Sequence, residues 1–188
     1  IGTVSGRSVA NINETIYFLS QDGVYYYGGG KIYPVAFDLG EFTDLVNVTY
    51  LDKAVAVAYK NSYLLAIAGT GSTTNNIVFE FDTLTNRWTK HQYAFSIYDF
   101  CLDGDDLYCA ASDKKIYKLD TGTTDGGTSI TYQWVSDALD LGKPGMKKKV
   151  KNIAVELGNV SAGGTLSVYL KEDGGSYSSA YSVAIPTT

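Results

Sequence analysis

Residues Thr15–Gly28 read TIYFLSQDGVYYYG, two short apolar runs around a polar turn. The runs Thr15–Leu19 and Gly23–Tyr27 are rich in β-branched and aromatic residues, which suit a pleated strand. Between them, Gln21 and Asp22 precede a glycine, as expected for a tight turn. This stretch therefore predicts an antiparallel hairpin.

Both strands of this hairpin recur further along the chain. The first strand recurs as Ile16–Leu19, Tyr63–Ala66 and Leu107–Ala110. The second strand recurs as Gly23–Gly28, Ile77–Asp82 and Lys115–Asp120. The repeat of about 40 to 50 residues is the spacing of β-propeller blades.

Three groups of consecutive antiparallel strands follow from this repeat. The expected strands are Ser8–Ala10, Thr15–Leu19, Gly23–Tyr27 and Lys31–Val35; then Ala54–Tyr59, Tyr63–Ala68, Asn76–Phe81 and Trp88–Tyr93; then Ile97–Leu102, Leu107–Ala111 and Lys115–Leu119. Residues Asp38–Asp52 are interpreted as an insertion, with one or two helical turns within Leu39–Val46. Each group should be a meander that stacks face to face with the next, as propeller blades do.

A second module is expected after residue 127, because the Gly- and Thr-rich stretch 122–127 resembles a linker. We assign 1–127 to about three propeller-like blades and 128–188 to the start of a β-sandwich. In the second module, alternating apolar residues predict three longer strands. They are Ile130, Tyr132 and Trp134; Ile153, Val155 and Leu157; and Leu166, Val168 and Leu170.

Composition agrees with an all-β globular fold. The 188 residues are 45% hydrophobic and only 19% charged, which argues against disorder. Sixteen Tyr and 20 Gly suit many short strands joined by turns. We expect more than about 40% strand and less than about 10% helix. No run of apolar residues is long enough for a membrane span.

The order of the motifs resembles that of phage tail and head–tail structural proteins. The motifs are Gly6–Val9, Ile16–Tyr25, Tyr63–Ile67, Phe79–Trp88, Leu107–Ser112, Ile116–Asp120, Asp137–Gly142 and Lys147–Lys149. They extend over about residues 2–173, and each alone is weakly specific. This resemblance implies a structural role in the virion, with other virion proteins and copies of the chain as partners.

Two other functions stay open at this point. An exposed aromatic platform would favour a carbohydrate-binding module of a receptor-binding or adhesion protein, and a groove with two facing carboxylates would favour a glycosidase. Because the chain begins at Ile1, we expect it to be part of a longer polypeptide. Three blades rarely close a ring, so two outer faces, at Thr15–Leu19 and Ile116–Leu119, should be apolar and drive self-association.

The candidate interaction patch is the basic cluster Lys147, Lys148, Lys149 and Lys151. It could contact DNA or an acidic neighbour protein, or it could be a solvated hairpin whose charges protect a strand edge.

No catalytic, metal or cofactor site is expected. His91 is the only histidine, Arg7 and Arg87 are the only arginines, and no Gly-x-Ser-x-Gly motif is found. We therefore predict that the chain is not an enzyme.

Four further side-chain patterns need a structural explanation. Cys101 and Cys109 flank one turn and are interpreted as reduced, buried thiols, with a cross-strand disulfide as the alternative. Aspartates at turns, such as Asp82, suit Asx-turns better than Ca²⁺ ligands. Tyr25–Tyr27 should be core residues, with a sugar or partner site as the alternative. Trp88 should be buried near Phe79 or Phe81.

Overall fold

Strands make up 48% and helices 9% of the residues that the computed structural model describes, and its sheets are antiparallel. The described residues are 1–122, 124–125, 128–129, 133, 146–147, 150, 152–156, 164–171, 175–178 and 181–185. The all-β prediction and its strand and helix contents are confirmed. The chain divides into two compact units, Ile1–Gln133 and Trp134–Thr188. The assignment of 1–127 to blades and 128–188 to a sandwich stays a prediction.

The first sheet is a four-stranded meander in chain order. Its strands are β1 (Ala10–Ile12), β2 (Thr15–Ser20), β3 (Gly23–Gly28) and β4 (Lys31–Pro34). The predicted strand at Ser8–Ala10 is displaced, because the 3₁₀ turn η1 (Gly6–Ser8) occupies its first residue and β1 begins at Ala10. The hairpin predicted from Thr15–Gly28 is confirmed, with Tyr17 paired to Tyr26.

The second sheet is also a four-stranded meander. Its strands are β5 (Val55–Tyr59), β6 (Ser62–Ile67), β7 (Ile77–Asp82) and β8 (Arg87–His91). Every residue of β6 is buried, so this strand is covered on both faces. That explains its unbroken apolar sequence, Tyr63–Ile67, which is typical of a strand buried on both sides.

The insertion before β5 contains the helix α1 (Phe42–Leu45) and the 3₁₀ segment η2 (Val48–Lys53). The helical turn predicted within Leu39–Val46 is confirmed. Phe42, Val46 and Leu51 are buried in the core between the first two sheets. The insertion therefore closes one side of that core.

The third sheet has three strands in the order β11-β10-β9. They are β9 (Ile97–Asp103), β10 (Asp106–Ala111) and β11 (Ile116–Lys118). The pairing of β9 with β10 shifts between Ala110 and Ala111, which indicates a bulge there.

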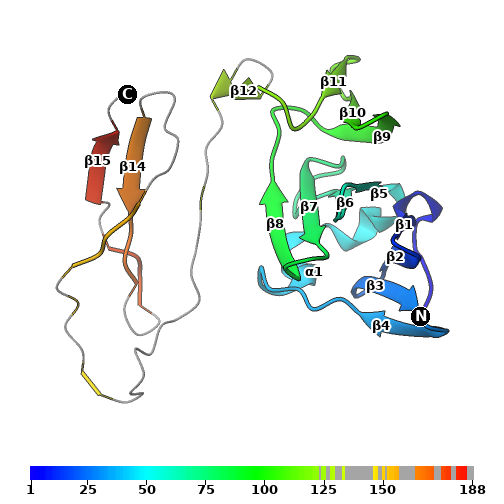
Figure 1. Cartoon of the computed structure of the whole chain (residues 1–188), viewed down its shortest axis with the longest axis horizontal. Coiled ribbons are helices and arrows are strands. Elements are labelled where there is room, and N and C mark those ends of the chain that lie inside the picture. Colours follow the sequence, from blue (N-terminus) through cyan, green and yellow to red (C-terminus); the bar gives the residue numbers. More distant parts are fainter. Residues whose placement is uncertain are drawn as a thin grey trace. The chain divides into compact units, whose positions relative to one another are not determined.

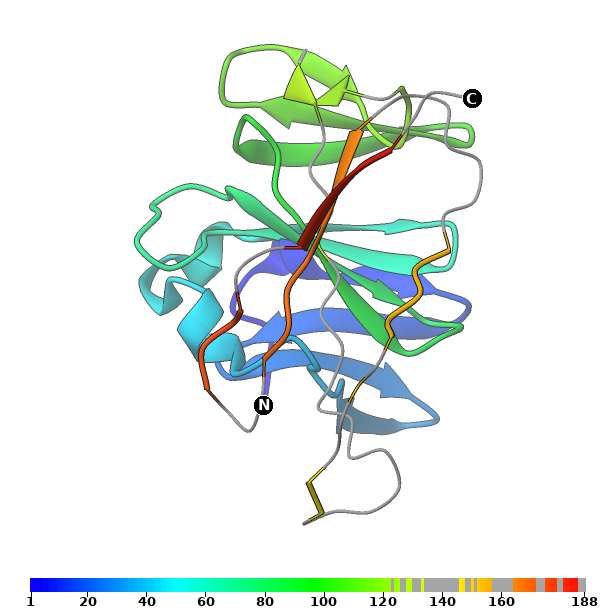
Figure 2. The ribbon, with the colours of Figure 1, turned by 90° about the vertical axis from the view of Figure 1, so that its left-hand side faces the viewer.

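The three sheets lie one above another, with the second in the middle (Figures 1 and 2). Across the sheets, β5 lies against β1 on one side and against β9 on the other. The first strands of the three meanders are therefore neighbours.

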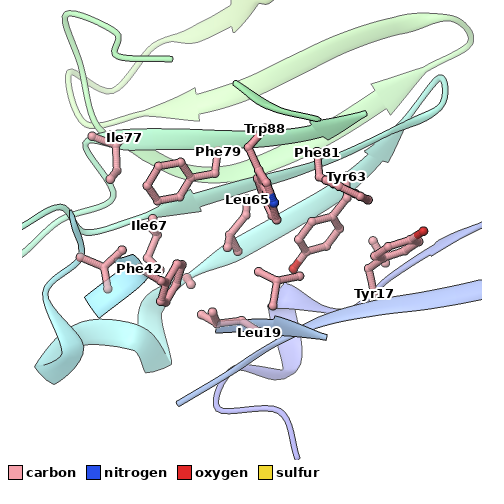
Figure 3. Packing of buried hydrophobic residues seen from close by; sticks show 14 of the residues in the cluster. Tyr17, Leu19, Phe42, Tyr63, Leu65, Ile67, Ile77, Phe79, Phe81 and Trp88 are labelled. Carbon is pink, nitrogen blue, oxygen red and sulfur yellow. The ribbon is translucent and has the colours of Figure 1, made fainter. Parts of the chain in front are cut away.

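One hydrophobic core fills the space between the first and second sheets (Figure 3). Trp88 is 5% exposed, and its ring centroid lies 5.0 Å from that of Phe81 and 6.3 Å from that of Phe79. The prediction for Trp88 is confirmed. A second core, which includes Leu64, Val78 and Leu107, joins the second and third sheets.

Buried hydrogen bonds join the N-terminal segment to the second sheet. Ser5 Oγ donates to the carbonyl of Ala54, and Tyr63 Oη donates to the carbonyl of Ser8, each over 2.7 Å. Ser8 Oγ in turn accepts from the backbone N–H of Leu19 at 3.1 Å. Burial raises the pKa of Tyr63, so its hydroxyl stays a donor. These bonds connect the N-terminal segment both to β2 of the first sheet and to β6 of the second.

Four short strands follow β11 in the described residues. They are β12 (Thr124–Asp125), β13 (Thr128–Ser129), β14 (Gly164–Val168) and β15 (Tyr181–Ile185). β12 pairs with β13, and β14 pairs with β15.

The strands predicted for 128–188 are found only in part. Leu166 and Val168 share a half-buried face of β14, as predicted, but Leu170 lies beyond its end. The strand predicted at Ile153 and Val155 is wrong, because 152–156 have no regular structure and are exposed. Ile130, Tyr132, Trp134 and Leu157 lie outside the described residues.

Candidate interaction surfaces

The first sheet presents one apolar face away from the core. Tyr17, Leu19, Val24 and Tyr26 point into the core between the sheets. Successive side chains of a strand point to opposite faces, so their neighbours face the other way. We call this outer surface the open face; it consists of Ile16, Phe18, Tyr25, Tyr27, Ile32 and Pro34.

Strand register arranges the open face in two rows. Ile16 pairs with Tyr27, which pairs with Ile32, and Phe18 pairs with Tyr25, which pairs with Pro34. Ile16 is 36% exposed, and Tyr27 and Ile32 are each 43% exposed. These six side chains carry no charge. The expected apolar outer face at Thr15–Leu19 is found only in part, because Phe18 is 7% exposed and Ile16 is the one exposed apolar side chain of that strand. The exposed apolar side chains of the open face lie mainly on β3 and β4, at Tyr27, Ile32 and Pro34.

The tyrosine run Tyr25–Tyr27 divides between the two faces of its strand. Tyr26 packs on Tyr17 at 5.9 Å and on Tyr33 at 5.2 Å, between ring centroids. Tyr25 stacks on Phe18 at 6.1 Å, and its hydroxyl donates to Asp22 at 2.8 Å. The prediction that all three are core residues is right for Tyr26 and wrong for Tyr27, whereas Tyr25 is half-buried on the open face.

The outer face of the third sheet is charged. The register puts Asp99 beside Ala110 and Ile116, and Cys101 beside Tyr108 and Lys118. We call this surface the charged face; it consists of Asp99, Cys101, Asp103, Asp106, Tyr108, Ala110, Ile116 and Lys118.

The expectation of a second apolar outer face at Ile116–Leu119 is wrong. Ile116 is 77% exposed on the charged face, but Leu119 is 6% exposed and belongs to the second core. Ion pairs span this face, from Lys118 to Asp106 and from Arg7 to Asp99 at 2.8 Å. The outer face of the first sheet is therefore apolar, whereas the outer face of the third sheet is charged.

The only histidine of the chain, His91, is held by a carboxylate. His91 Nε2 lies 2.8 Å from Glu80 Oε2, and both side chains are about one-third exposed, at 35% and 31%. The His91 hydrogen bond, and to a lesser degree the Ser62 hydroxyl, hold the pKa of Glu80 below its usual value, while burial opposes them. Ser62 thus acts on the carboxylate, whereas a nucleophilic triad would place it against the imidazole.

Acid should weaken the fold partly through Glu80. Because its folded pKa is depressed, the Glu80 contribution is present above the ordinary value of 4.5 and is lost as the pH falls through the folded value. Glu80→Gln should therefore reduce the loss of urea resistance between about pH 7 and about pH 3. Glu41→Gln, at an exposed site, serves as the control and should keep the full loss. An unchanged pH dependence in Glu80→Gln would contradict this.

The two cysteines are not joined by a disulfide. Cys101 pairs with Tyr108, so Cys109 points to the opposite face of the sheet. Cys109 is buried and Cys101 is exposed, so the interpretation as reduced thiols is confirmed, whereas the burial of Cys101 is not. Cys109 pairs with Phe100, the residue before Cys101, and this difference of one residue puts the two thiols on opposite faces of the sheet.

Both arginines form ion pairs with aspartates, and Asp82 accepts hydrogen bonds from the backbone. Arg7 contacts Asp99, and Arg87 lies 3.4 Å from Asp38. Asp82 accepts the backbone N–H groups of Leu84 at 2.8 Å and Thr85 at 3.3 Å. The bond to Leu84 is the main cause of the lowered pKa of Asp82. Asp82 thus forms the predicted Asx-turn.

In the predicted basic patch, Lys147 is exposed, and Lys148, Lys149 and Lys151 lie outside the described residues. A shallow depression beside α1 is lined by Asp44, Thr70, Asn76 and Lys90, among others. Within the described ranges, no group of three or more His, Cys, Asp or Glu side chains is placed to hold a metal ion. Nor is any helix in them long and apolar enough to cross a membrane.

The contact between Glu80 and His91 is a feature that the sequence analysis did not predict. Comparison with known proteins adds no further residue: no protein-family model matches this chain, and no curated protein sequence matches it.

Proposed function

We propose that this chain is a structural component of a phage virion, in the tail or the head–tail connection. It acts there through protein–protein assembly, and not as an enzyme. Its partners are other virion proteins and copies of itself. The order of motifs from Gly6 to Lys149 and the all-β architecture support this proposal.

In this proposal the three meanders are blades of a propeller-like domain. Two features favour blades over unrelated sheets. Adjacent meanders pack face to face through continuous apolar cores. The first strands β1, β5 and β9 are neighbours, as they are where blades converge on a common axis. Residues 128–188 would begin a β-sandwich module, and the patch around Lys147 would contact a neighbouring protein or the phage DNA.

The open face is the observation on which the assembly proposal mainly rests. Its uncharged side chains include Tyr27 and Ile32, each 43% exposed. Contiguous exposed apolar surface of roughly a few hundred Å² marks interaction sites. A rigid stack of sheets with one such surface is suited to bind a neighbour in an assembled particle.

A carbohydrate-binding module is the second candidate, because Tyr25 and Tyr27 put aromatic rings on one outer face. Sugar sites also need several polar groups that fix the ligand. Beside the open face, the nearby polar groups include Asn11, paired with Ile16, and Asp22, which already accepts from Tyr25. The apolar composition of this face therefore fits a protein partner better.

Purified particles of the encoding phage test the proposal. Mass spectrometry should detect peptides of this chain, such as those around Phe79–Trp88, in particles that survive a density gradient and nuclease treatment. The stoichiometry should be an integer multiple of the tail symmetry, as expected for a repeated structural part. Absence of the chain from such particles would overturn the proposed function.

A further inference from the structure

We propose that the segment Thr3–Ser8 is a strap that bridges the three sheets and opens without unfolding them. This inference goes beyond the proposed function and does not depend on it. The strap contains the 3₁₀ turn η1 and continues into β1 through the extended residue Val9. Polar contacts join the strap to each of the three sheets.

The strap completes one edge of the first sheet. β1 pairs with β2 from Thr15 to Tyr17, and beyond that point the strap bonds to β2. The backbone N–H of Val4 donates to the carbonyl of Leu19 at 3.0 Å. The backbone N–H of Leu19 in turn donates to Ser8 Oγ at 3.1 Å. Both backbone groups of Leu19 are therefore satisfied by the strap.

The strap joins the second sheet through buried, uncharged groups. Ser5 Oγ donates to the carbonyl of Ala54, just before β5, at 2.7 Å. The Tyr63 hydroxyl of β6 donates to the carbonyl of Ser8, also at 2.7 Å. Ser5 and Ser8 are 4% and 0% exposed. Because a buried polar group that loses its partner costs free energy, these bonds favour the closed position.

The strap joins the third sheet through Arg7. Its guanidinium lies 2.8 Å from the carboxylate of Asp99 on β9 and donates to the carbonyl of Tyr98 at 2.7 Å. The Arg7 and Asp99 side chains are 57% and 59% exposed. An exposed ion pair is weak and is screened by salt. This link should therefore be the weakest of the three.

Little apolar surface holds the strap in place. Only Val4 has an apolar side chain, and it is half-buried against the first core, whereas the other members are serine, threonine, glycine and arginine. Segments with few buried apolar contacts open at a lower free energy than the core. Within the strap, the Ser5 carbonyl accepts the backbone N–H and the hydroxyl of Ser8, at 3.0 and 2.7 Å. These internal bonds allow the strap to open as one body.

Opening would change which backbone groups the edge of β2 presents. The N–H and the carbonyl of Leu19 would lose their partners, as would the carbonyl of Ala54 and the hydroxyl of Tyr63. Unpaired groups at a strand edge recruit other strands. The strap thus governs access to this end of β2.

Amide hydrogen exchange of the whole chain, measured by NMR and corrected for intrinsic rates, tests the proposal. The amides of Val4 and Leu19 report on the strap, and that of Leu65, on the fully buried strand β6, reports on the sheets. We expect both strap amides to exchange at least about tenfold faster than Leu65. Exchange of all three at one rate would show that the strap opens only when the sheets unfold, and would overturn the proposal.

Ser5→Ala tests whether the strap opens as one body. This variant removes the bond to Ala54 and leaves the bonds at Leu19 intact. It should therefore speed the exchange of Val4 and Leu19 by a common factor of at least about five, and leave Leu65 unchanged. Faster exchange at only one of the two strap amides would contradict a single opening motion.

Ser72→Ala is the matched control, because it removes a bond from a serine hydroxyl to a backbone carbonyl outside the strap. Ser72 Oγ donates to the carbonyl of Thr74 at 2.8 Å. This variant should leave the exchange of the strap amides unchanged. Acceleration equal to that in Ser5→Ala would show a general loss of stability and would overturn the proposal.

Arg7→Met tests the link to the third sheet by a separate measurement. In the wild-type chain, an increase in NaCl from about 0.05 M to about 1 M should speed the exchange of the strap amides, because salt screens the pair with Asp99. Arg7→Met should exchange faster at low salt and lose this dependence. A salt dependence that persists in Arg7→Met would contradict the role assigned to Arg7.

Discussion

Trp88→Ala is expected to lower the free energy of unfolding by about 3–5 kcal/mol, the range for large aromatic truncations in cores. The Trp88 side chain is 5% exposed and packs on Phe81 and on Phe37, with ring centroids 5.0 and 5.1 Å away. Its indole Nε1–H donates to the carbonyl of Ala36 at 2.8 Å. Replacement of Trp88 by alanine would leave a cavity in this core and would leave the carbonyl of Ala36 without its donor. Urea denaturation followed by circular dichroism measures the loss.

Two control variants separate burial from the hydrogen bond. Tyr98→Ala truncates an aromatic side chain that is 52% exposed on β9 and should cost less than about 1 kcal/mol. Trp88→Phe keeps a ring against Phe81 but removes the donor to Ala36, so its cost should be intermediate. If Trp88→Ala lowered the free energy of unfolding no more than Tyr98→Ala does, the burial of Trp88 between the first two sheets would be contradicted.

The strands were predictable because the two features that define a hairpin, the strand pattern and the turn, are both local in the sequence. The alternation in Thr15–Leu19 and the turn before Gly23 depend only on neighbouring residues, and the hairpin they predicted is present. In contrast, the start of β1 at Ala10 depends on Ser8, whose side chain and carbonyl bond to Leu19 and Tyr63. Those long-range bonds have no local signature.

Register explains which surface predictions were wrong. Ile116 and Leu119 were expected on one outer face, but Ile116 is on the charged face and Leu119 in the core. The bulge beside Ala110 and the pairing of Cys101 with Tyr108 could not be read from composition. A shift of one residue exchanges the faces of a strand, so the cysteine positions alone could not decide the disulfide.

The Glu80–His91 pair illustrates the same limit for candidate sites. The two residues are eleven positions apart, on strands joined by the turn that Asp82 caps. Val78 pairs with His91 and Glu80 with Thr89, so Glu80 and His91 are diagonal neighbours. Only the exact turn length creates this contact. An isolated histidine in the sequence therefore gave no indication of its partner.

Leu107→Ala is expected to lower the free energy of unfolding by about 2–5 kcal/mol. Leu107 is 1% exposed and lies in the second core with Leu64 and Val78 of the second sheet. If the three meanders form one cooperative stack, loss of this side chain should shift the whole unfolding transition. Tryptophan fluorescence and far-ultraviolet circular dichroism should then report the same midpoint.

Leu102→Ala is the matched control for this prediction, because Leu102 pairs with Leu107 across β9 and β10. Leu102 is 43% exposed, so its truncation removes the same atoms from a site that already contacts water. It should cost less than about 1 kcal/mol. Equal losses for both variants would show that Leu107 is not in a closed core. Separate midpoints for the two probes in Leu107→Ala would show that the chain does not unfold in a single transition, and the prediction of one shared transition would then be wrong.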